Sequence, residues 1–315
     1  MAVFQRLDSE LRVAGRLALA LLLPFLWPGT PAAAPRVVTS IAPVNALASA
    51  IMGDLGEPRQ IVRGYGSPHA YQMRPSDAAS LHDADLVLWI GPSLETFLQR
   101  PLEARGTATR VVELSALPGL RLLPNRSGGL LFPEEHAHGH DAHAGFDAHI
   151  WLSPFNAKRM GAAIAAELAT LDPENSSTYR RNAEQLGQRI DVMQADIAKR
   201  LAPVRDTPFV VFHDAFQYFE EAFGLNSVGS VTVSPDRMPS AKRIKELKKA
   251  IHESGVRCVF GEPRFEPALM RMLIEDSNIR SGVLDPLGSE IPPGPEAYFQ
   301  MMDANTNALI ECLHP

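Results

Sequence analysis

The chain has 315 residues, of which 45% are hydrophobic and 21% are charged, a composition typical of one large or two medium globular domains with a sizeable core. Its formal net charge of −6 argues against nucleic-acid binding, which usually requires a basic surface. We therefore expect no nucleic-acid partner.

The first 34 residues have the pattern of a secretory signal peptide. Three arginines precede an apolar run over 17–27, and small residues follow at 30–34. Because the apolar run is too short to span a bilayer, we predict a cleaved leader, with the cut within 30–34. Its removal takes away three basic and two acidic residues, which leaves a mature net charge of −7.

The next part of the chain alternates short apolar runs with helical patterns. Pro43 begins a helical stretch that continues to Met52. Three runs rich in β-branched and aliphatic residues predict strands, at 36–41, 86–90 and 110–113. This alternation indicates βα units around a mostly parallel sheet, within an N-terminal lobe predicted to cover 35–171.

Two helix starts follow each other closely. Ser153-Pro154 combines an N-cap residue with proline at the first helical position and predicts a helix to about Leu171. Asp172-Pro173 repeats this signal, and apolar residues then recur at helical spacing as far as Leu201. We expect 172–201 to form a connecting helix about 40 Å long, at 1.5 Å per residue.

Residues 202–315 return to the βα pattern and are predicted to form a C-terminal lobe. Strands are expected at 209–212, 227–233 and 257–260, and helices near 215–223 and 239–253. The predicted fold class is therefore α/β: two βα lobes with mostly parallel sheets, joined by one long helix, with a cleft between the lobes.

The two cysteines, Cys258 and Cys312, agree with export. An oxidising compartment favours their pairing, and two buried free thiols are the alternative. A zinc site built from them is not expected, because neither belongs to a CxxC pair. With no cysteine near 30–34, a lipid anchor there is not expected either.

One segment is unusually rich in histidine. Residues 134–149 contain five of the ten histidines and four carboxylates. Imidazole is a common ligand for zinc and related metals, and the intervening Ala, Gly and acidic residues offer little apolar surface for a packed core. We interpret 134–148 as a loop that gathers metal; an acidic surface loop with incidental histidines is the alternative.

Three histidines lie beside ordered elements. His69 is in a turn-rich segment before a helix, His149 shortly precedes the helix start at Ser153, and His213 follows a predicted strand. Ligands of α/β proteins bind beyond the carboxyl ends of such strands, but the long spacings match no compact zinc finger. Spacing alone is therefore only weak evidence that these three histidines bind one metal ion. The remaining three histidines of the mature chain are expected to be surface or structural residues: His82, His252 and His314.

A resemblance to a known family strengthens the prediction that these three histidines bind one metal ion. Six motifs, in order over nearly the whole mature chain, are similar to those of the cluster A-I solute-binding proteins of metal ABC transporters, and specifically to the zinc-uptake (ZnuA) type. They lie at 67–77, 147–154, 211–219, 239–243, 260–263 and 284–288. The long joining helix, the histidine-rich loop and the C-terminal cysteine pair are also features of that type.

The resemblance implies that His69, His149 and His213 bind a metal in the cleft between the lobes. Manganese-type relatives usually have a carboxylate at the third position, whereas three imidazoles favour zinc. A tetrahedral zinc needs a fourth donor. Some relatives supply a glutamate just before the first histidine, where this chain has Pro68, so water or Asp285 is the expected donor.

The resemblance also implies a function. The chain is expected to bind Zn²⁺ with high affinity in the periplasm, as transported cargo, and to deliver it to the membrane permease of a zinc ABC transporter. It is expected to be a monomer and not an enzyme. Manganese or iron uptake is the alternative within the family. A zinc hydrolase is a further alternative, although the chain has no HExxH motif and offers only Glu262 as a candidate base.

Overall fold

The structure is a computed structural model that describes residues 34–105, 108–126, 145–232, 240–263 and 267–314. Almost all of the predicted signal peptide lies outside the described residues, as does most of the histidine-rich segment. None of the helices in these ranges combines the length and the apolar character that a bilayer span requires.

The N-terminal lobe contains a four-stranded parallel sheet with the order β2-β1-β3-β4. Its strands are β1 (Val37–Thr39), β2 (Arg59–Gln60), β3 (Leu86–Trp89) and β4 (Arg110–Glu113). Every residue of β1 and β3 is buried. Strands covered on both faces have continuous apolar runs, which is why these two are visible in the sequence, while the two-residue β2 is not.

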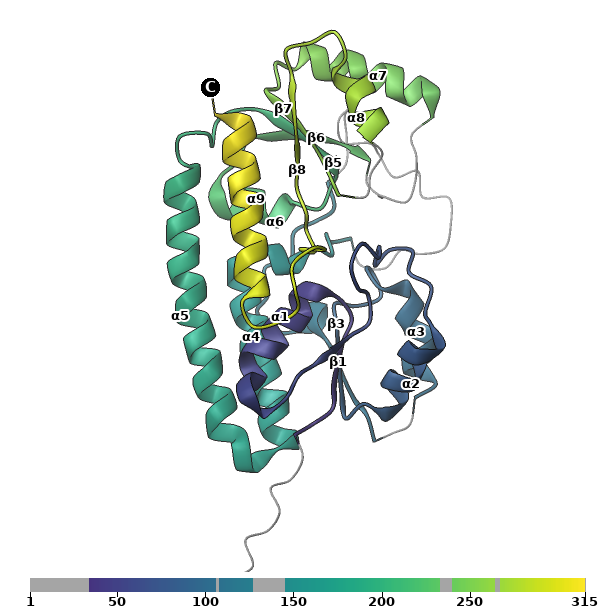
Figure 1. The fold of residues 1–315 in the computed structure, drawn as a ribbon, viewed down its shortest axis with the longest axis vertical. Helices are drawn as coiled ribbons and strands as arrows, with labels where there is room; N and C mark the ends of the chain where they lie inside the picture. Colours follow the sequence, from purple (N-terminus) through teal and green to yellow (C-terminus); the bar gives the residue numbers. More distant parts are fainter. Residues whose placement is uncertain (1–33, 106–107, 127–144, 233–239, 264–266, 315) are drawn as a thin grey trace, which may run out of the picture. The chain divides into compact units, whose positions relative to one another are not determined.

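Helices cover both faces of this sheet. They are α1 (Ala42–Met52), α2 (Pro75–Asp83), α3 (Thr96–Glu103) and α4 (Pro154–Leu171). Figure 1 shows α2 and α3 on one side of β1 and β3, and α1 and α4 on the other. The side chain of Ser153 accepts a hydrogen bond from the Asn156 amide and so forms the predicted N-cap of α4.

A long helix joins the lobes, as predicted. After a short 3₁₀ turn (Pro173–Asn175), α5 (Ser176–Leu201) continues for 26 residues. It packs against α1 and α4 of the first lobe and against α6 and α9 of the second. The apolar stripe found in the sequence faces these helices, with Tyr179, Ile190 and Leu201 all buried.

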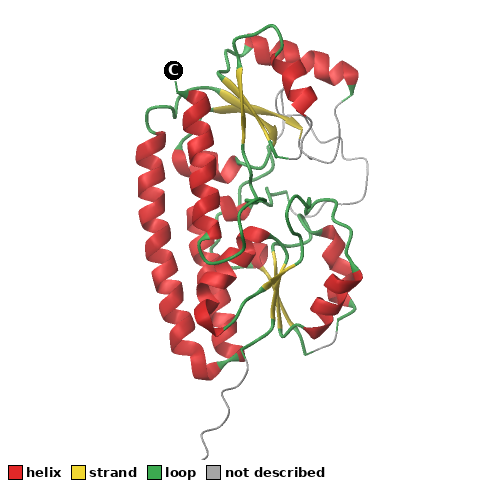
Figure 2. Cartoon of the chain, in the orientation of Figure 1, coloured by secondary structure: helices red, strands yellow, loops and turns green. Residues whose placement is uncertain are grey.

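The C-terminal lobe repeats the topology of the first. Its parallel sheet has the order β6-β5-β7-β8, which is again second, first, third and fourth in chain order. The strands are β5 (Phe209–His213), β6 (Ser227–Thr232), β7 (Cys258–Gly261) and β8 (Arg280–Val283). The helices are α6 (Gln217–Phe223), α7 (Ala241–Glu253), α8 (Pro267–Ile274) and α9 (Ala297–Leu313). Figure 2 shows both sheets with their flanking helices.

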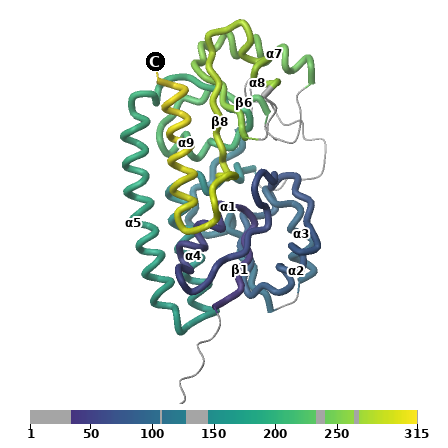
Figure 3. The backbone as a smooth tube through the Cα atoms, viewed as in Figure 1, coloured from purple at the N-terminus to yellow at the C-terminus, as the bar shows by residue number. Residues whose placement is uncertain are grey.

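The last helix is a second bridge between the lobes, which the sequence did not predict. Helix α9 packs against β8 in its own lobe and also against α5 and α1, and Figure 3 shows it running beside α5. One hydrophobic core cluster contains buried residues of both lobes, from Val37 in β1 to Phe260 in β7 and Leu313 in α9. A shared apolar core of this kind opposes large rigid-body motion between the lobes.

The predicted disulfide is present. Cys258 in β7 and Cys312 in α9 are bonded, with a separation of 54 residues in the sequence. Both cysteines are buried. The bond thus fastens the C-terminal helix to a central strand of the second sheet.

Candidate metal centre

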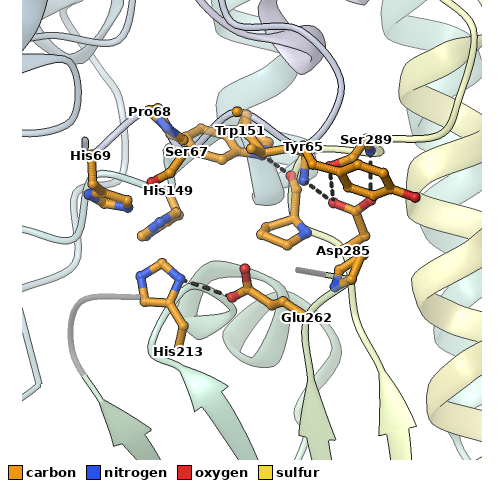
Figure 4. A pocket seen from close by; sticks show the side chains of 14 residues that line it. Tyr65, Ser67, Pro68, His69, His149, Trp151, His213, Glu262, Asp285 and Ser289 are labelled. Atoms are coloured by element: carbon orange, nitrogen blue, oxygen red, sulfur yellow. Dashed lines mark hydrogen bonds and ion pairs between the residues drawn. The ribbon is translucent and has the colours of Figure 1, made fainter. Parts of the chain in front are cut away.

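The structure brings the three predicted histidines together. Their ring centroids are 5.5 Å apart for His69 and His149, 5.2 Å for His69 and His213, and 4.9 Å for His149 and His213. One nitrogen from each ring lies within 4.8 Å of the other two. Because a zinc ion binds each nitrogen at roughly 2.0–2.1 Å, small movements of the rings suffice to place all three around one ion. Figure 4 shows the three rings pointing toward one another.

Each histidine comes from a different kind of local structure. His213 is the last residue of the buried strand β5. His149 is the N-cap residue of a 3₁₀ turn (Ile150–Leu152) that leads into α4. His69 lies in the turns between β2 and α2. The site therefore collects one side chain from the carboxyl edge of the second sheet and two from connecting segments.

Two of the rings are held by carboxylates. Asp147 Oδ1 lies 2.7 Å from His149 Nδ1, and Glu262 Oε1 lies 3.0 Å from His213 Nδ1 (Figure 4). A carboxylate can only accept a hydrogen bond, so Nδ1 of each ring carries the proton and Nε2 keeps its lone pair. The ring of His69 has no hydrogen bond to any described residue.

The free ring nitrogens are buried. Within the described part of the chain, Nε2 of His69 and Nε2 of His213 are buried with no hydrogen-bond partner. Burial, followed by repulsion from the neighbouring histidines, lowers the pKa of both rings well below the ordinary value. Both imidazoles are therefore neutral at physiological pH, which is the form that binds a metal ion.

The rings line a small cavity between the lobes. Its walls also include Tyr65 and Ser67 from the loop before His69, and Pro286 and Ser289 from the loop after β8. The cavity volume is about 40 Å³, and a single water needs roughly 10–15 Å³ of such space. The cavity thus fits an ion with a few waters rather than an organic solute.

Asp285 lines this cavity, but its carboxylate accepts hydrogen bonds from the backbone of the turn that follows it. Oδ1 accepts hydrogen bonds from the backbone amides of Leu287 (3.0 Å) and Gly288 (2.9 Å), and Oδ2 accepts one from that of Ser289 (2.6 Å). Asp285 is also absent from the group of side chains whose ligand atoms converge. Of the two expected fourth donors, this geometry favours water.

Trp151 ties the ligand-bearing turn to the opposite loop. Its Nε1 donates a hydrogen bond of 2.7 Å to the Pro286 carbonyl, and its ring lies 5.2 Å from that of His149. Its own carbonyl accepts a hydrogen bond from Tyr298 in α9. The turn that carries His149 is therefore fixed to the C-terminal lobe.

Residues 127–144, which include most of the histidine-rich segment, lie outside the described residues, but the chain on both sides of them is described. Pro124 and Phe146 form an antiparallel bridge, and the Asp147 amide donates to the Leu123 carbonyl at 2.8 Å. Arg126 forms ion pairs with Asp214 and Glu220 of the second lobe. The two described flanks are therefore held to each other near Asp147, and Arg126 is held to the second lobe.

The remaining described histidines are elsewhere. His82, His252 and His314 are exposed, and none lines the cavity. Sequence patterns did not reveal the partners of these two rings: Glu262 was expected only as a candidate base, and Asp147 had no expected role. An acidic residue two positions before His149 is visible in the sequence, whereas the Glu262 contact requires knowledge of the strand order.

Comparisons with known proteins agree with this architecture. The chain matches the family described as zinc-uptake complex component A, periplasmic (ZnuA), over residues 37–312. The high-affinity zinc uptake system protein ZnuA of Brucella abortus (strain 2308) is 40% identical over 306 residues, covering 88% of this chain and 91% of the relative. That of Yersinia pestis is 36% identical over 293 residues, with 89% and 92% covered.

A solved structure gives the same result at the level of the fold. The crystal structure of a ZnuA protein superimposes with a TM-score of 0.75 at 26% identity, and the match covers 89% of this chain and 99% of that one. Because the family match extends from β1 to α9 and thus includes all three histidines, the chain belongs to the ZnuA family of periplasmic zinc-uptake components.

Proposed function

We propose that this protein captures Zn²⁺ outside the inner membrane through His69, His149 and His213 and delivers it to the permease of an ABC transporter. The observation that carries the proposal is the convergence of three imidazoles whose ligand atoms lie within 4.8 Å of one another. Two of the rings are already oriented by carboxylates, and two have buried, unpartnered Nε2 atoms within the described residues.

The donor set favours zinc over manganese. All three donors are neutral imidazoles, and a carboxylate, which Mn²⁺ prefers, is missing from the converging group. Water completes the tetrahedron, since the oxygens of Asp285 are occupied by backbone amides. The named relatives, with 40% and 36% identity, are high-affinity zinc uptake proteins.

The same geometry argues for transport rather than hydrolysis. A zinc hydrolase needs a general base beside the metal-bound water. Glu262, the candidate base, instead accepts the hydrogen bond of His213 Nδ1. The cavity also leaves room for an ion with a few waters and not for an ester or peptide substrate.

The proposal extends to location, partners and the histidine-rich segment. Residues 1–34 act as the cleaved leader that places the mature chain in the periplasm, where it works as a monomer. The predicted lobes at 35–171 and 202–315 stay close together during binding, because α5, α9 and a common core link them. The segment 134–148 gathers zinc weakly.

Calorimetric titration of the mature, metal-free protein with Zn²⁺ and Mn²⁺ tests the function. We expect tight zinc binding at one site and much weaker manganese binding. Replacing one ligand, as in His213→Ala, should lower zinc affinity by about 100-fold or more, because a zinc site of four donors contributes roughly 10–16 kcal/mol in total. The control is His82→Ala, which removes an exposed histidine outside the cavity. Equal zinc affinity for both variants would refute the proposed site.

A further inference from the structure

We propose that Asp147 and Glu262 are positioning residues of the zinc site: each holds the Nδ1 proton of one ligand ring, so that Nε2 faces the cavity, and together they place two negative charges behind the cation. The inference rests on the proposed function and deepens it. It assigns a role in zinc affinity to one buried carboxylate, Asp147, and one partly buried carboxylate, Glu262.

Asp147 contacts His149 at two points, the backbone amide and the ring. Its Oδ1 accepts a hydrogen bond from the backbone amide of His149 at 2.9 Å and lies 2.7 Å from the ring Nδ1. Both side chains are buried, with exposed fractions of 6% and 7%. One oxygen thus fixes the backbone and the ring of the same residue, and the ring can neither flip nor exchange its proton with water without breaking this contact.

Glu262 reaches His213 through the strand order. β5 and β7 are parallel neighbours, with Val211 opposite Phe260. Continuing this register by two residues places Glu262, the first residue after β7, opposite His213, the last residue of β5. The measured contact is 3.0 Å, and the two side chains are 13% and 3% exposed. The pairing of these strands therefore brings a carboxylate to the back of the ring.

The two contacts have a chemical consequence. A neutral imidazole has one protonated and one free nitrogen, and the hydrogen-bond acceptor decides which is which. Carboxylates behind metal-bound histidines fix the tautomer and raise the basicity of the ligand nitrogen. They also attract a divalent cation across a poorly solvated space, where charges interact more strongly than in water. The ring of His69 has no hydrogen bond to a described carboxylate that would fix its tautomer or raise the basicity of its ligand nitrogen.

A pair of substitutions at one position separates orientation from charge. Glu262→Gln keeps an oxygen that can accept the Nδ1 proton but removes the charge, whereas Glu262→Leu removes both. We expect the Leu variant to bind Zn²⁺ about 10- to 100-fold more weakly and the Gln variant to fall between it and the unmodified protein. Asp147→Asn should behave like the Gln variant.

The tautomer of each ring provides a readout that a general structural role would not change. Long-range ¹H–¹⁵N NMR correlations of the histidine rings distinguish Nδ1–H from Nε2–H. In the metal-free protein we expect Nδ1–H for His149 and His213. In Glu262→Leu, we expect His213 to acquire Nε2–H while His149 keeps its tautomer.

The matched control is Glu95→Gln. Glu95 is a completely buried carboxylate whose oxygens accept hydrogen bonds from the backbone amides of Ile90 and Gly91, and it does not line the cavity. We expect this variant to keep both the zinc affinity and the ring tautomers of the unmodified protein. Thermal unfolding of each variant verifies that it is folded.

The outcomes separate the two proposals. If the unmodified protein binds zinc tightly but Glu262→Leu matches it in affinity and in the His213 tautomer, the positioning role is refuted and the zinc site stands. If Glu262→Leu does not fold, the test rests on the zinc affinity of Glu262→Gln and on the ring tautomers of the unmodified protein. An Nε2–H tautomer of His213 in the unmodified protein would overturn the inference. If the unmodified protein binds no zinc, the proposed function itself fails.

Discussion

The two lobes bring their histidines to the site in different ways. In the C-terminal lobe, His213 ends the buried strand β5, and Glu262, just after the neighbouring strand β7, lies behind its ring. In the N-terminal lobe, His69 lies in a turn segment, and its ring has no hydrogen bond to a described residue. The fixed half of the site therefore comprises His213, at the end of a strand, and His149, which Asp147 holds beside a 3₁₀ turn. The loop that carries His69 supplies the adjustable half.

The largest expected effect concerns the stability of the fixed half. Replacing Cys258 and Cys312 together by alanine removes the bond between β7 and α9. For a closed loop of this length, chain-entropy reasoning gives a loss of about 4 kcal/mol in the free energy of unfolding. Urea unfolding followed by circular dichroism measures this loss, and reduction of the disulfide in the unmodified protein should reproduce it.

This double variant also tests whether the fixed half of the site depends on the disulfide. Neither cysteine lines the cavity, and β7 keeps its backbone ladders to β5 and β8. We therefore expect the folded variant to bind Zn²⁺ with unchanged affinity. A parallel loss of affinity would show that the position of Glu262 depends on the disulfide rather than on the sheet.

Residue patterns predicted the fold well where the signal is local. The helix start at Ser153-Pro154 and the buried runs of β1, β3 and β5 depend on N-capping and on continuous burial, which a single segment reveals. The strand β8, with the sequence Arg-Ser-Gly-Val, has no apolar run and was missed. Its place at the edge of the sheet, beside β7 alone, explains this.

The site was predicted less completely. The three histidines were singled out, but their meeting depended on a family resemblance, because ligands 80 and 64 residues apart carry no spacing signal. The contact between Glu262 and His213 depends on β5 and β7 being neighbours. Strand order is a property of tertiary structure, so local sequence reasoning could not reach it.

The next prediction concerns a carboxylate that serves the fold of the N-terminal lobe rather than the site. Burial raises the pKa of Glu95 to about 7, while an unfolded chain has a glutamate pKa near 4.3. Between these values the folded protein binds more protons than the unfolded chain, so the free energy of unfolding should fall as pH rises from about 4.5 to 7. The total change from this group is about 4 kcal/mol.

The substitution Glu95→Gln should remove this part of the pH dependence. Urea unfolding of the metal-free protein at several pH values between 4.5 and 7.5 measures it, with Glu296→Gln as a control because Glu296 is exposed. If Glu95→Gln leaves the pH profile unchanged, Glu95 is ionised in the folded state throughout this range. Its role in the N-terminal lobe would then be that of a charged cap for the amides of Ile90 and Gly91.

A hydrogen bond of the adjustable half crosses the mouth of the cavity. The hydroxyl of Tyr65, in the loop that carries His69, donates to the carboxylate of Glu290 in the loop after β8. Tyr65 is 39% exposed, so this bond competes with water. A contact of this kind contributes about 1 kcal/mol, enough to affect how fast the loop opens without defining the site.

The smallest expected effect is therefore kinetic. Tyr65→Phe removes the donor to Glu290 and should raise the rate constant of zinc release about fivefold, as expected for the loss of about 1 kcal/mol. Stopped-flow transfer of zinc to a chelating dye measures that rate. The matched control is Tyr71→Phe, because the Tyr71 hydroxyl donates to Asp77 within its own lobe, at 2.9 Å. If both variants release zinc at the rate of the unmodified protein, opening of the His69 loop does not limit release. The difference between the fixed and the adjustable half would then be a structural one with no effect on the rate of zinc release.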